Sequence, residues 1–243
     1  MNFKLLNKIA LVSAFFILIS MPAKAGMDFG FGIVADSSDF KTSGSSKEGE
    51  SVDINAAGDG EVSTAAAKTV GVNIAHGFAE VIAKGDDSWL SHLGLSVGID
   101  VIPGEETIRS ETRTDTAAAS GAGQQATETH ATTAQVSNIA SIYWEPTLYL
   151  NDMIGVYYKA GATKMNVSAA KTGGTSRYND QTLYGKVTGA GLRITSPWGI
   201  YLKYEHIETD WESLVFKSDQ GNADHIYGDV DQESDRISIG YKF

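Results

Sequence analysis

The last nine residues, Asp235–Phe243, read DRISIGYKF and alternate between polar or small and apolar side chains. In an extended strand, Ile237, Ile239, Tyr241 and Phe243 share one face. Most soluble domains end in a few polar, loosely held residues, so a strand that stops on an aromatic residue calls for an explanation. A strand that is paired on both sides and ends at a membrane interface would supply one.

Seven further segments upstream are strand-like, and no sustained helical period follows the first 25 residues. They are DFGFGIVAD (28–36), TVGVNIAHGFAEVIA (69–83), HLGLSVGIDVI (92–102), SNIASIYWEPTLYL (137–150), MIGVYYKAGATKM (153–165), TLYGKVTGAGLRIT (182–195) and GIYLKYEHIE (199–208). The phase of 182–195 stays open. The sequence thus predicts an all-β fold of eight strands, with ten as the alternative, each of about 9–11 residues.

The connections between these segments alternate between long and short. The long ones are Ser37–Lys68, Pro103–Gln135, Val167–Asp180 and Glu212–Gln232, and the short ones are Lys84–Ser91, Asn151–Asp152 and Ser196–Gly199. A soluble sandwich has no reason to keep this order, whereas outer-membrane barrels combine short periplasmic turns with long extracellular loops. We therefore predict a closed, antiparallel, up-and-down transmembrane β-barrel. Glu106–Thr116 is expected to extend the third strand as a hydrated hairpin, and Thr116–Ala134 to be mobile or disordered.

Residues 1–25 have the pattern of a cleaved secretory signal peptide. Lys4 and Lys8 precede the 13-residue apolar run Ile9–Met21, and Ala23 and Ala25 are small residues at the cleavage positions. A membrane anchor is less favoured, because a spanning helix needs about 20 apolar residues. We expect a signal peptide at 1–25 and one barrel domain at 26–243.

The remaining chain is acidic and has no cysteine. Cleavage would remove three lysines and no acid, so 19 basic residues fall to 16 against 30 acidic ones, a net charge of −14. That charge argues against a nucleic-acid partner, whose phosphates demand a basic surface. No zinc-ligand spacing is present, and we expect neither a metal nor another cofactor.

The terminal ISIGYKF resembles the carboxy-terminal signal of Gram-negative outer-membrane barrels. The architecture of residues 26–243 resembles the small eight-stranded group that includes the OmpA transmembrane domain, OmpX, OmpW and the Opa-like adhesins. The resemblance implies that Ile237, Ile239, Tyr241 and Phe243 are recognised by the barrel-assembly machinery. It also implies a monomer in the outer membrane, in contact with its lipid and lipopolysaccharide. Three tryptophans near strand ends, Trp89, Trp198 and Trp211, are expected in the aromatic girdles of such a barrel.

The strand faces opposite to the apolar ones carry charges. They are Asp100, Glu145, Lys159, Lys203, Glu205, Arg236 and Lys242; Glu80 joins them in one of two phases of its strand. An eight-stranded barrel is just wide enough for side chains to fill it, and buried charges must pair. We therefore expect a salt-bridged plug, with a gated conduit as the alternative.

The sequence leaves three functions open. The favoured one is a structural or surface-interaction protein with mobile, acidic and polar extracellular loops, whose ligand the sequence does not name. The second is a small porin-like channel for small or hydrophobic solutes, as in the OmpW group. The third is a lipid-modifying enzyme, which is least favoured because the five histidines are scattered and no catalytic set can be assembled from them.

Overall fold

The structure is a computed structural model that describes residues 26–47, 62–85, 90–118, 125–172, 178–217 and 225–243. The predicted signal peptide and Trp89 lie outside these ranges. The elements are β1 (Gly26–Lys47), β2 (Val62–Lys84), the 3-10 turn η1 (Leu90–His92), β3 (Leu93–Ala118), β4 (Gln125–Tyr149), β5 (Ile154–Thr172), β6 (Gln181–Thr195), β7 (Ile200–Trp211), β8 (Leu214–Lys217) and β9 (His225–Lys242). Among the described residues, no helix is long and apolar enough to cross a membrane.

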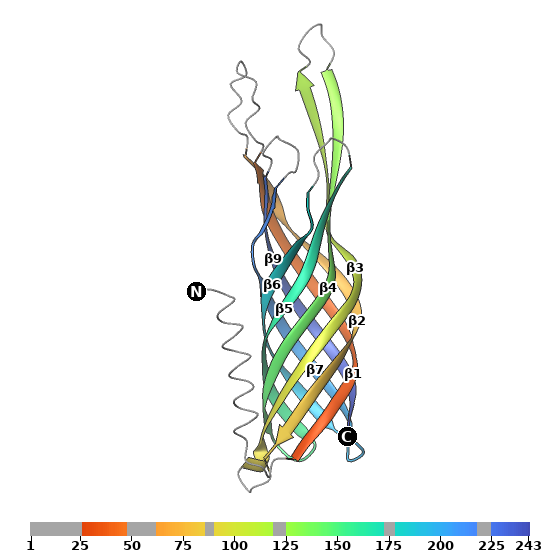
Figure 1. The fold of residues 1–243 in the computed structure, drawn as a ribbon, viewed down its shortest axis with the longest axis vertical. Helices are drawn as coiled ribbons and strands as arrows, with labels where there is room; N and C mark the ends of the chain where they lie inside the picture. The colour runs from red at the N-terminus through yellow and green to blue at the C-terminus, as the bar shows by residue number, and fades with distance from the viewer. Residues whose placement is uncertain (1–25, 48–61, 86–89, 119–124, 173–177, 218–224) are drawn as a thin grey trace.

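The strands close into a tall barrel (Figure 1). Consecutive strands pair in antiparallel fashion, and β9 pairs with both β7 and β1. β8 continues β7 along β9, because Asp210 pairs with Asp231 and Leu214 then pairs with Gly228. β7 and β8 therefore share one position in the wall, and the predicted closed, up-and-down barrel of eight strands is confirmed.

The last strand joins the first as far as the terminal residue. Phe243 and Phe29 exchange two backbone hydrogen bonds, each of 3.0 Å between nitrogen and oxygen. On the outer face, Phe29, Phe31, Tyr241 and Phe243 form an aromatic cluster with neighbouring ring centroids 6.2–6.5 Å apart. The carboxyl terminus is thus part of the barrel wall, at the lower end in Figure 1.

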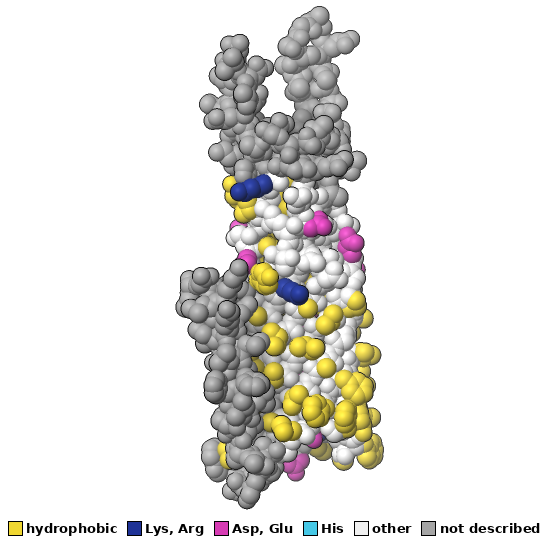
Figure 2. Space-filling view, viewed as in Figure 1, with side chains coloured by type: hydrophobic (Ala, Val, Ile, Leu, Met, Phe, Trp, Pro, Cys, Tyr) yellow, Lys and Arg dark blue, Asp and Glu magenta, His cyan; other side chains and the backbone are white. Residues whose placement is uncertain are grey.

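The outer surface has a lower apolar zone and an upper polar zone (Figure 2). Hydrophobic side chains gather over the lower part of the face that Figure 2 shows. On β1, β9 and β7, the last apolar outward row pairs across the strands at Ala35, Ile237 and Tyr204. The next outward row is polar, at Ser37, Asp235 and His206.

The interior is divided in the opposite sense. Charged side chains are buried in the lower zone, and a cluster of apolar side chains, here called the upper core, fills the barrel above them. Its buried members are Phe40, Val72, Ile102, Ile108, Val136, Ile139, Met165, Val167, Leu183, Trp211, Leu214, Phe216 and Val230. The upper zone is therefore built as a barrel in water, with apolar side chains inside, and the lower zone as a barrel in lipid.

The strands are longer than the predicted 9–11 residues, because they continue into the water-facing zone. β3 has 26 residues and β4 has 25. The extension of the third strand through Glu106–Thr116 is confirmed. The expected disorder of Thr116–Ala134 is wrong where it overlaps β3 and β4, since pairing between the two strands satisfies a backbone that has little to bury. Residues 119–124 lie outside the described ranges.

Two tryptophans of the expected girdles are described. Trp198 lies in the short turn between β6 and β7 at the lower end and is 80% exposed. The girdle position expected for Trp211 is wrong, because its side chain is only 6% exposed and belongs to the upper core. Trp211 is in the inward phase of β7 above the polarity reversal, where an inward aromatic side chain packs with other apolar groups.

Pro146 lies inside β4, where it cannot donate a ladder hydrogen bond. The β4–β5 ladder omits Glu145 and Pro146 but keeps the same register on both sides of them. The carbonyl of Glu145 accepts a hydrogen bond from the Thr147 hydroxyl at 3.2 Å. The proline thus interrupts the β4–β5 ladder locally without changing the register of the two strands.

The two-zone interior predicts different costs for two apolar truncations on β7. Ile207 is fully buried inside the barrel, whereas Leu202 faces outward and is 49% exposed. Ile207→Ala should lower the free energy of unfolding by about 2–4 kcal/mol, because it leaves a cavity. Leu202→Ala should cost clearly less in detergent. Denaturant titration of both folded variants checks this, and equal losses would contradict a packed interior at Ile207.

Candidate functional site

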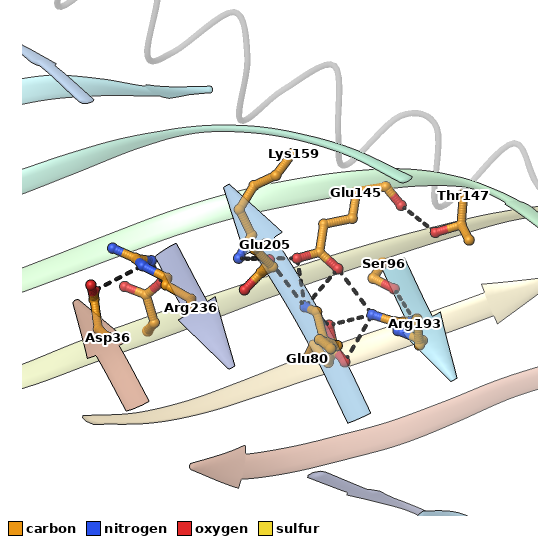
Figure 3. A network of polar contacts seen from close by, with 11 residues as sticks. Asp36, Glu80, Ser96, Glu145, Thr147, Lys159, Arg193, Glu205 and Arg236 are labelled. Atoms are coloured by element: carbon orange, nitrogen blue, oxygen red, sulfur yellow. Dashed lines mark hydrogen bonds and ion pairs between the residues drawn. The ribbon is translucent and has the colours of Figure 1, made fainter. Parts of the chain in front are cut away.

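The charged side chains inside the lower zone form two groups of ion pairs, which together are called the lumen network here (Figure 3). Its members come from all eight wall positions and are each at most 5% exposed. They are Asp36, Glu80, Asp100, Glu145, Lys159, Arg193, Lys203, Glu205 and Arg236.

Glu145 on β4 is the centre of the lower part of this network and has no exposed surface. Its Oε1 lies 2.7 Å from Lys203 Nζ and 3.1 Å from Lys159 Nζ. Its Oε2 accepts a hydrogen bond from Arg193 at 2.9 Å. One carboxylate therefore holds cations from β5, β6 and β7 together.

Two further carboxylates complete the lower part. Glu80 accepts hydrogen bonds from Arg193 at 3.0 Å to each oxygen. Glu205 lies 2.6 Å from Lys159 Nζ and 3.6 Å from Lys203 Nζ. Three acids thus face three bases, which is the balance that burial in a low-dielectric interior requires.

The upper part of the network is centred on Arg236. Its Nε lies 2.8 Å from Asp36 Oδ2, and its guanidinium reaches Asp100 Oδ2 at 3.4 Å. Asp36 also accepts a hydrogen bond from the Ser38 hydroxyl at 2.7 Å. His76 is buried beside this group, and neither of its ring nitrogens has a hydrogen-bond partner among the described residues.

Tyrosine rings line the network and cover its cations. Lys159 Nζ lies 4.0 Å from the centroid of Tyr143, and Lys203 Nζ lies 5.0 Å from that of Tyr157. Such cation–π contacts add to ion pairing when the cation is desolvated. Gly98 makes room for Tyr143, since a Cβ at Gly98 would lie 2.5 Å from the ring. Glycines on the inward strand faces therefore provide the space that large rings need in a narrow barrel.

Lys242, which was also expected in the lumen, is partly exposed at the lower end and pairs with Asp28 instead. The other six charged residues expected there are placed inside the barrel and in contact with other members of the network. They are Asp100, Glu145, Lys159, Lys203, Glu205 and Arg236. Glu80, which the sequence left between two phases, also points inward.

Sequence reasoning missed Arg193 and Asp36. β6 crosses the polarity reversal, so Leu183 faces inward near its upper end while Ile194 faces outward near its lower end. Such a strand has no single apolar face along its whole length, so the sequence alone does not show that Arg193 points inward. Asp36 directly follows the last apolar residue of its segment, and its inward phase was the signal that could have found it.

A cavity of about 320 Å³ opens at the lower end of the barrel. Its lining includes Asp28, Lys84, Asp152 and Lys242, and Arg193 also contributes to its wall. Lys84 lies 3.2 Å from Asp152, and Lys242 lies 2.5 Å from Asp28. The cavity is thus a polar vestibule that leads to the lumen network.

The outer surface above the apolar zone carries polar contacts of its own. Lys41 Nζ lies 2.6 Å from Glu233 Oε1, and this hydrogen bond lowers the pKa of Glu233 and raises the pKa of Lys41. Asp235 accepts hydrogen bonds from His206 at 3.0 Å and from Tyr204 at 3.1 Å, and these lower its pKa. All these groups are solvated, so the shifts report local pairing and little stabilisation.

Among the described residues, no group of three or more histidine, aspartate or glutamate side chains is placed to hold a metal ion. His206 has the carboxylate of Asp235 beside it, but its ladder neighbour on β6 is Ala190. His92 Nδ1 lies 2.9 Å from the Tyr149 carbonyl oxygen. The described histidine side chains therefore do not form a serine–histidine–carboxylate set.

An apolar outer zone, a charged and buried interior and a backbone ladder closed around the barrel are what a hydrocarbon surrounding requires. The chain is thus a transmembrane β-barrel of the outer-membrane type. Within that class, its architecture is that of the small eight-stranded barrels.

No family model and no curated protein matches the sequence. The attachment invasion locus protein Ail of Yersinia pestis is similar at 12% identity and a TM-score of 0.40, over 87% of this chain and 99% of that one. Neisserial surface protein A is 10% identical with a TM-score of 0.34, over 88% of this chain and 97% of that one. The outer membrane protease OmpT from Escherichia coli is 9% identical with a TM-score of 0.39, over 92% of this chain and 99% of that one. Likenesses this distant add nothing about function.

The lumen network predicts a large effect of removing its central charge. Glu145→Gln should lower the free energy of unfolding by about 3–5 kcal/mol, because three buried cations lose a shared partner. Adding Lys203→Met should recover part of that loss, because acids and bases are again balanced. Denaturant titrations in detergent measure both effects.

Glu233→Gln is the matched control for this prediction, since it removes a carboxylate from an exposed ion pair. Its unfolding midpoint should stay close to that of the wild type. A Glu145→Gln protein as stable as the control would contradict the structural role of the network.

The terminal aromatic residue predicts a separation between insertion and stability. Deleting Phe243 should reduce the amount of protein in the outer membrane far more than it lowers the detergent unfolding midpoint, because an unpaired edge must first be delivered to the assembly machinery. Phe29→Ala is the control, since it removes a ring from the same cluster and leaves the carboxy-terminal pattern intact. Proportional losses in both measurements for both variants would reduce Phe243 to a packing contact.

Proposed function

We propose that this chain is a non-enzymatic outer-membrane barrel that presents its upper end to partners outside the cell and does not conduct solutes. The observation that carries the proposal is the filling of the barrel. The lumen network occupies the lower zone, and the upper core occupies the zone above it. A solute would have to cross a layer of paired charges and then a layer of packed apolar side chains.

The upper zone supports a role at the cell surface. Its strands carry a packed core past the last apolar outward row, so the extracellular connections are held well away from the lipid. A barrel with only an anchoring role would not need this extension. The acidic charge of the chain and the outward carboxylates of β7 and β9 favour solvation of this end.

The channel alternative has one observation in its favour, the polar vestibule at the lower end. Its link to a charged interior is what a gated conduit would need. The upper core argues against that alternative, because opening it would expose Phe40, Ile108 and Met165, which are at most 2% exposed, to water.

The enzyme alternative would need a nucleophile or a metal near the outer-leaflet level. His206 and Asp235 lie there on neighbouring strands, but Ser37 lies on the far side of Asp235 and not beside the histidine. This order lacks the histidine between nucleophile and carboxylate that acyl transfer requires.

We further infer how the protein is exported and assembled, and where it is located, from residues 1–25, the strand pattern of 237–243 and the outer surface. Residues 1–25 direct export, and Ile237, Ile239, Tyr241 and Phe243 address the barrel-assembly machinery. The folded protein is a monomer in the outer membrane, where the apolar zone contacts lipid acyl chains. The polar row at Ser37, Asp235 and His206 lies at the level of the lipopolysaccharide head groups.

The proposal predicts no steady conductance when the folded protein is reconstituted into planar bilayers. A porin under the same salt and voltage serves as the positive control. Heat-dependent gel mobility must first show that the sample is folded. Reproducible, ohmic single-channel steps from the folded protein would overturn the closed-lumen proposal and favour the channel.

A further inference from the structure

The wall of the barrel is open between β2 and β3 in its upper zone. The β2–β3 ladder has only eight residue pairs, from Lys84–Gly94 up to Gly77–Val101. The ladders on either side continue much further, to Lys47–Val62 between β1 and β2 and to Ala118–Gln125 between β3 and β4. Within the described residues, Val62–His76 of β2 and Ile102–Ala118 of β3 therefore have no ladder with each other. We call this region the β2–β3 seam.

The local sequence explains why the strands separate here. Pro103 and Gly104 lie two and three residues after Val101, the last residue of β3 that pairs with β2. Gly104 has a φ of +109°, which residues other than glycine rarely adopt. The β3–β4 register shifts between Ile102 and Glu105, and the β4–β5 register shifts beside Asn138, whose φ is +52°. Irregularities on both strands of the hairpin turn it away from β2. In Figure 1, β3 and β4 rise beyond the other strands.

Side chains, and not backbone pairs, cross the seam. Arg109 on β3 donates hydrogen bonds to the Thr42 carbonyl and to the Ala66 carbonyl, each at 3.1 Å. Lys68 on β2 donates to the Ser110 carbonyl at 3.4 Å. These long side chains link β2 and β3 where the described residues of the two strands form no backbone ladder with each other.

We propose that the β2–β3 seam binds an extended segment of another polypeptide, which adds as a strand to one or both of its edges. The inference rests on the proposed surface-interaction role and names the class of partner. An unpaired strand edge offers a row of backbone donors and acceptors that an extended chain satisfies. Below the seam, in lipid, the wall is closed, so only the water-facing zone offers such an edge.

The seam also defines the pattern of its partner. Val70 and Ile74 on β2 pack against the upper core but remain only half-buried. A strand laid beside β2 would cover them with every second side chain. Glu105 and Glu106 expose carboxylates on the β3 side, whereas Lys68 and Arg109 are engaged with backbone carbonyls. The best partner is therefore an alternating segment of apolar and basic residues.

Amide hydrogen exchange in lipid nanodiscs tests the proposal with a defined probe. The probe is a synthetic peptide of about nine residues that alternates valine with lysine or threonine, and the control peptide carries proline at every second position. In the free protein, seam-facing amides within 69–76 and 102–108 should exchange quickly, and the probe, but not the control, should slow them. Protection of these amides without peptide, or no protection by the probe, would overturn the proposal.

A variant that closes the seam gives the second arm. Pro103→Thr combined with Gly104→Val removes the residues that favour the bulge, so the β2–β3 ladder should lengthen and probe affinity should fall at least about tenfold. Pro197→Thr, in a turn at the opposite end, is the matched control and should bind the probe as the wild type does. Unchanged binding by the double variant would place the peptide elsewhere and overturn the seam assignment.

Two further outcomes separate this inference from the function on which it rests. Sedimentation of the protein without peptide should show a monomer. Self-association that the double variant abolishes would make the occupant a second copy of this chain and overturn the assignment to another polypeptide. Failure of peptide binding leaves a non-conducting barrel intact, whereas conductance in planar bilayers would overturn the proposed function itself.

Discussion

Every structural feature of the lower zone follows from one constraint, that a backbone N–H or C=O facing hydrocarbon must have a partner within the protein. β1 and β9 meet this constraint by pairing to the last residue, where Phe243 bonds to Phe29. Once the wall is closed, its interior is too narrow for water to solvate charges freely. Glu145 and the three cations around it must therefore form ion pairs with one another.

The same strands serve two solvents, and this explains the reversal of polarity along them. On β7, Tyr201, Lys203 and Glu205 point into the barrel below the reversal, and Ile207 and Trp211 point into it above. Side chains alternate between the inner and outer faces along the whole strand. At the lipid boundary, the inner face changes from polar to apolar and the outer face from apolar to polar. The open β2–β3 seam lies in the zone where water can satisfy an unpaired edge, and the wall is complete where water is absent.

The sequence allowed the barrel to be predicted because period-two alternation and the order of long and short connections are both local signals. Strand number, closure and six residues of the lumen could be derived from them. Arg193 and Trp211 could not, because both lie on strands that cross the lipid boundary, and a residue's phase reveals its surroundings only if the solvent on that side is known. The extension of β3 was predicted, but the start of β4 at Gln125 was not, since a hairpin paired in water needs no apolar face to exist. The seam depends on Pro103 and Gly104, but only the register of the finished sheet shows which neighbour β3 leaves.

The position of Glu145 also bears on the order in which the barrel can form. Its partners come from β5, β6 and β7, while Glu80 on β2 and Ser96 on β3 both bond to the same Arg193. The neighbouring strands β4 and β5 can pair Glu145 with Lys159, but Arg193 on β6 has its carboxylate partners on β2 and β4, neither of which is next to β6. Hairpins that enter the bilayer one at a time would therefore carry unpaired ions into hydrocarbon. Insertion is therefore favourable only when most of the wall is assembled, which makes the network a kinetic checkpoint against partly inserted chains.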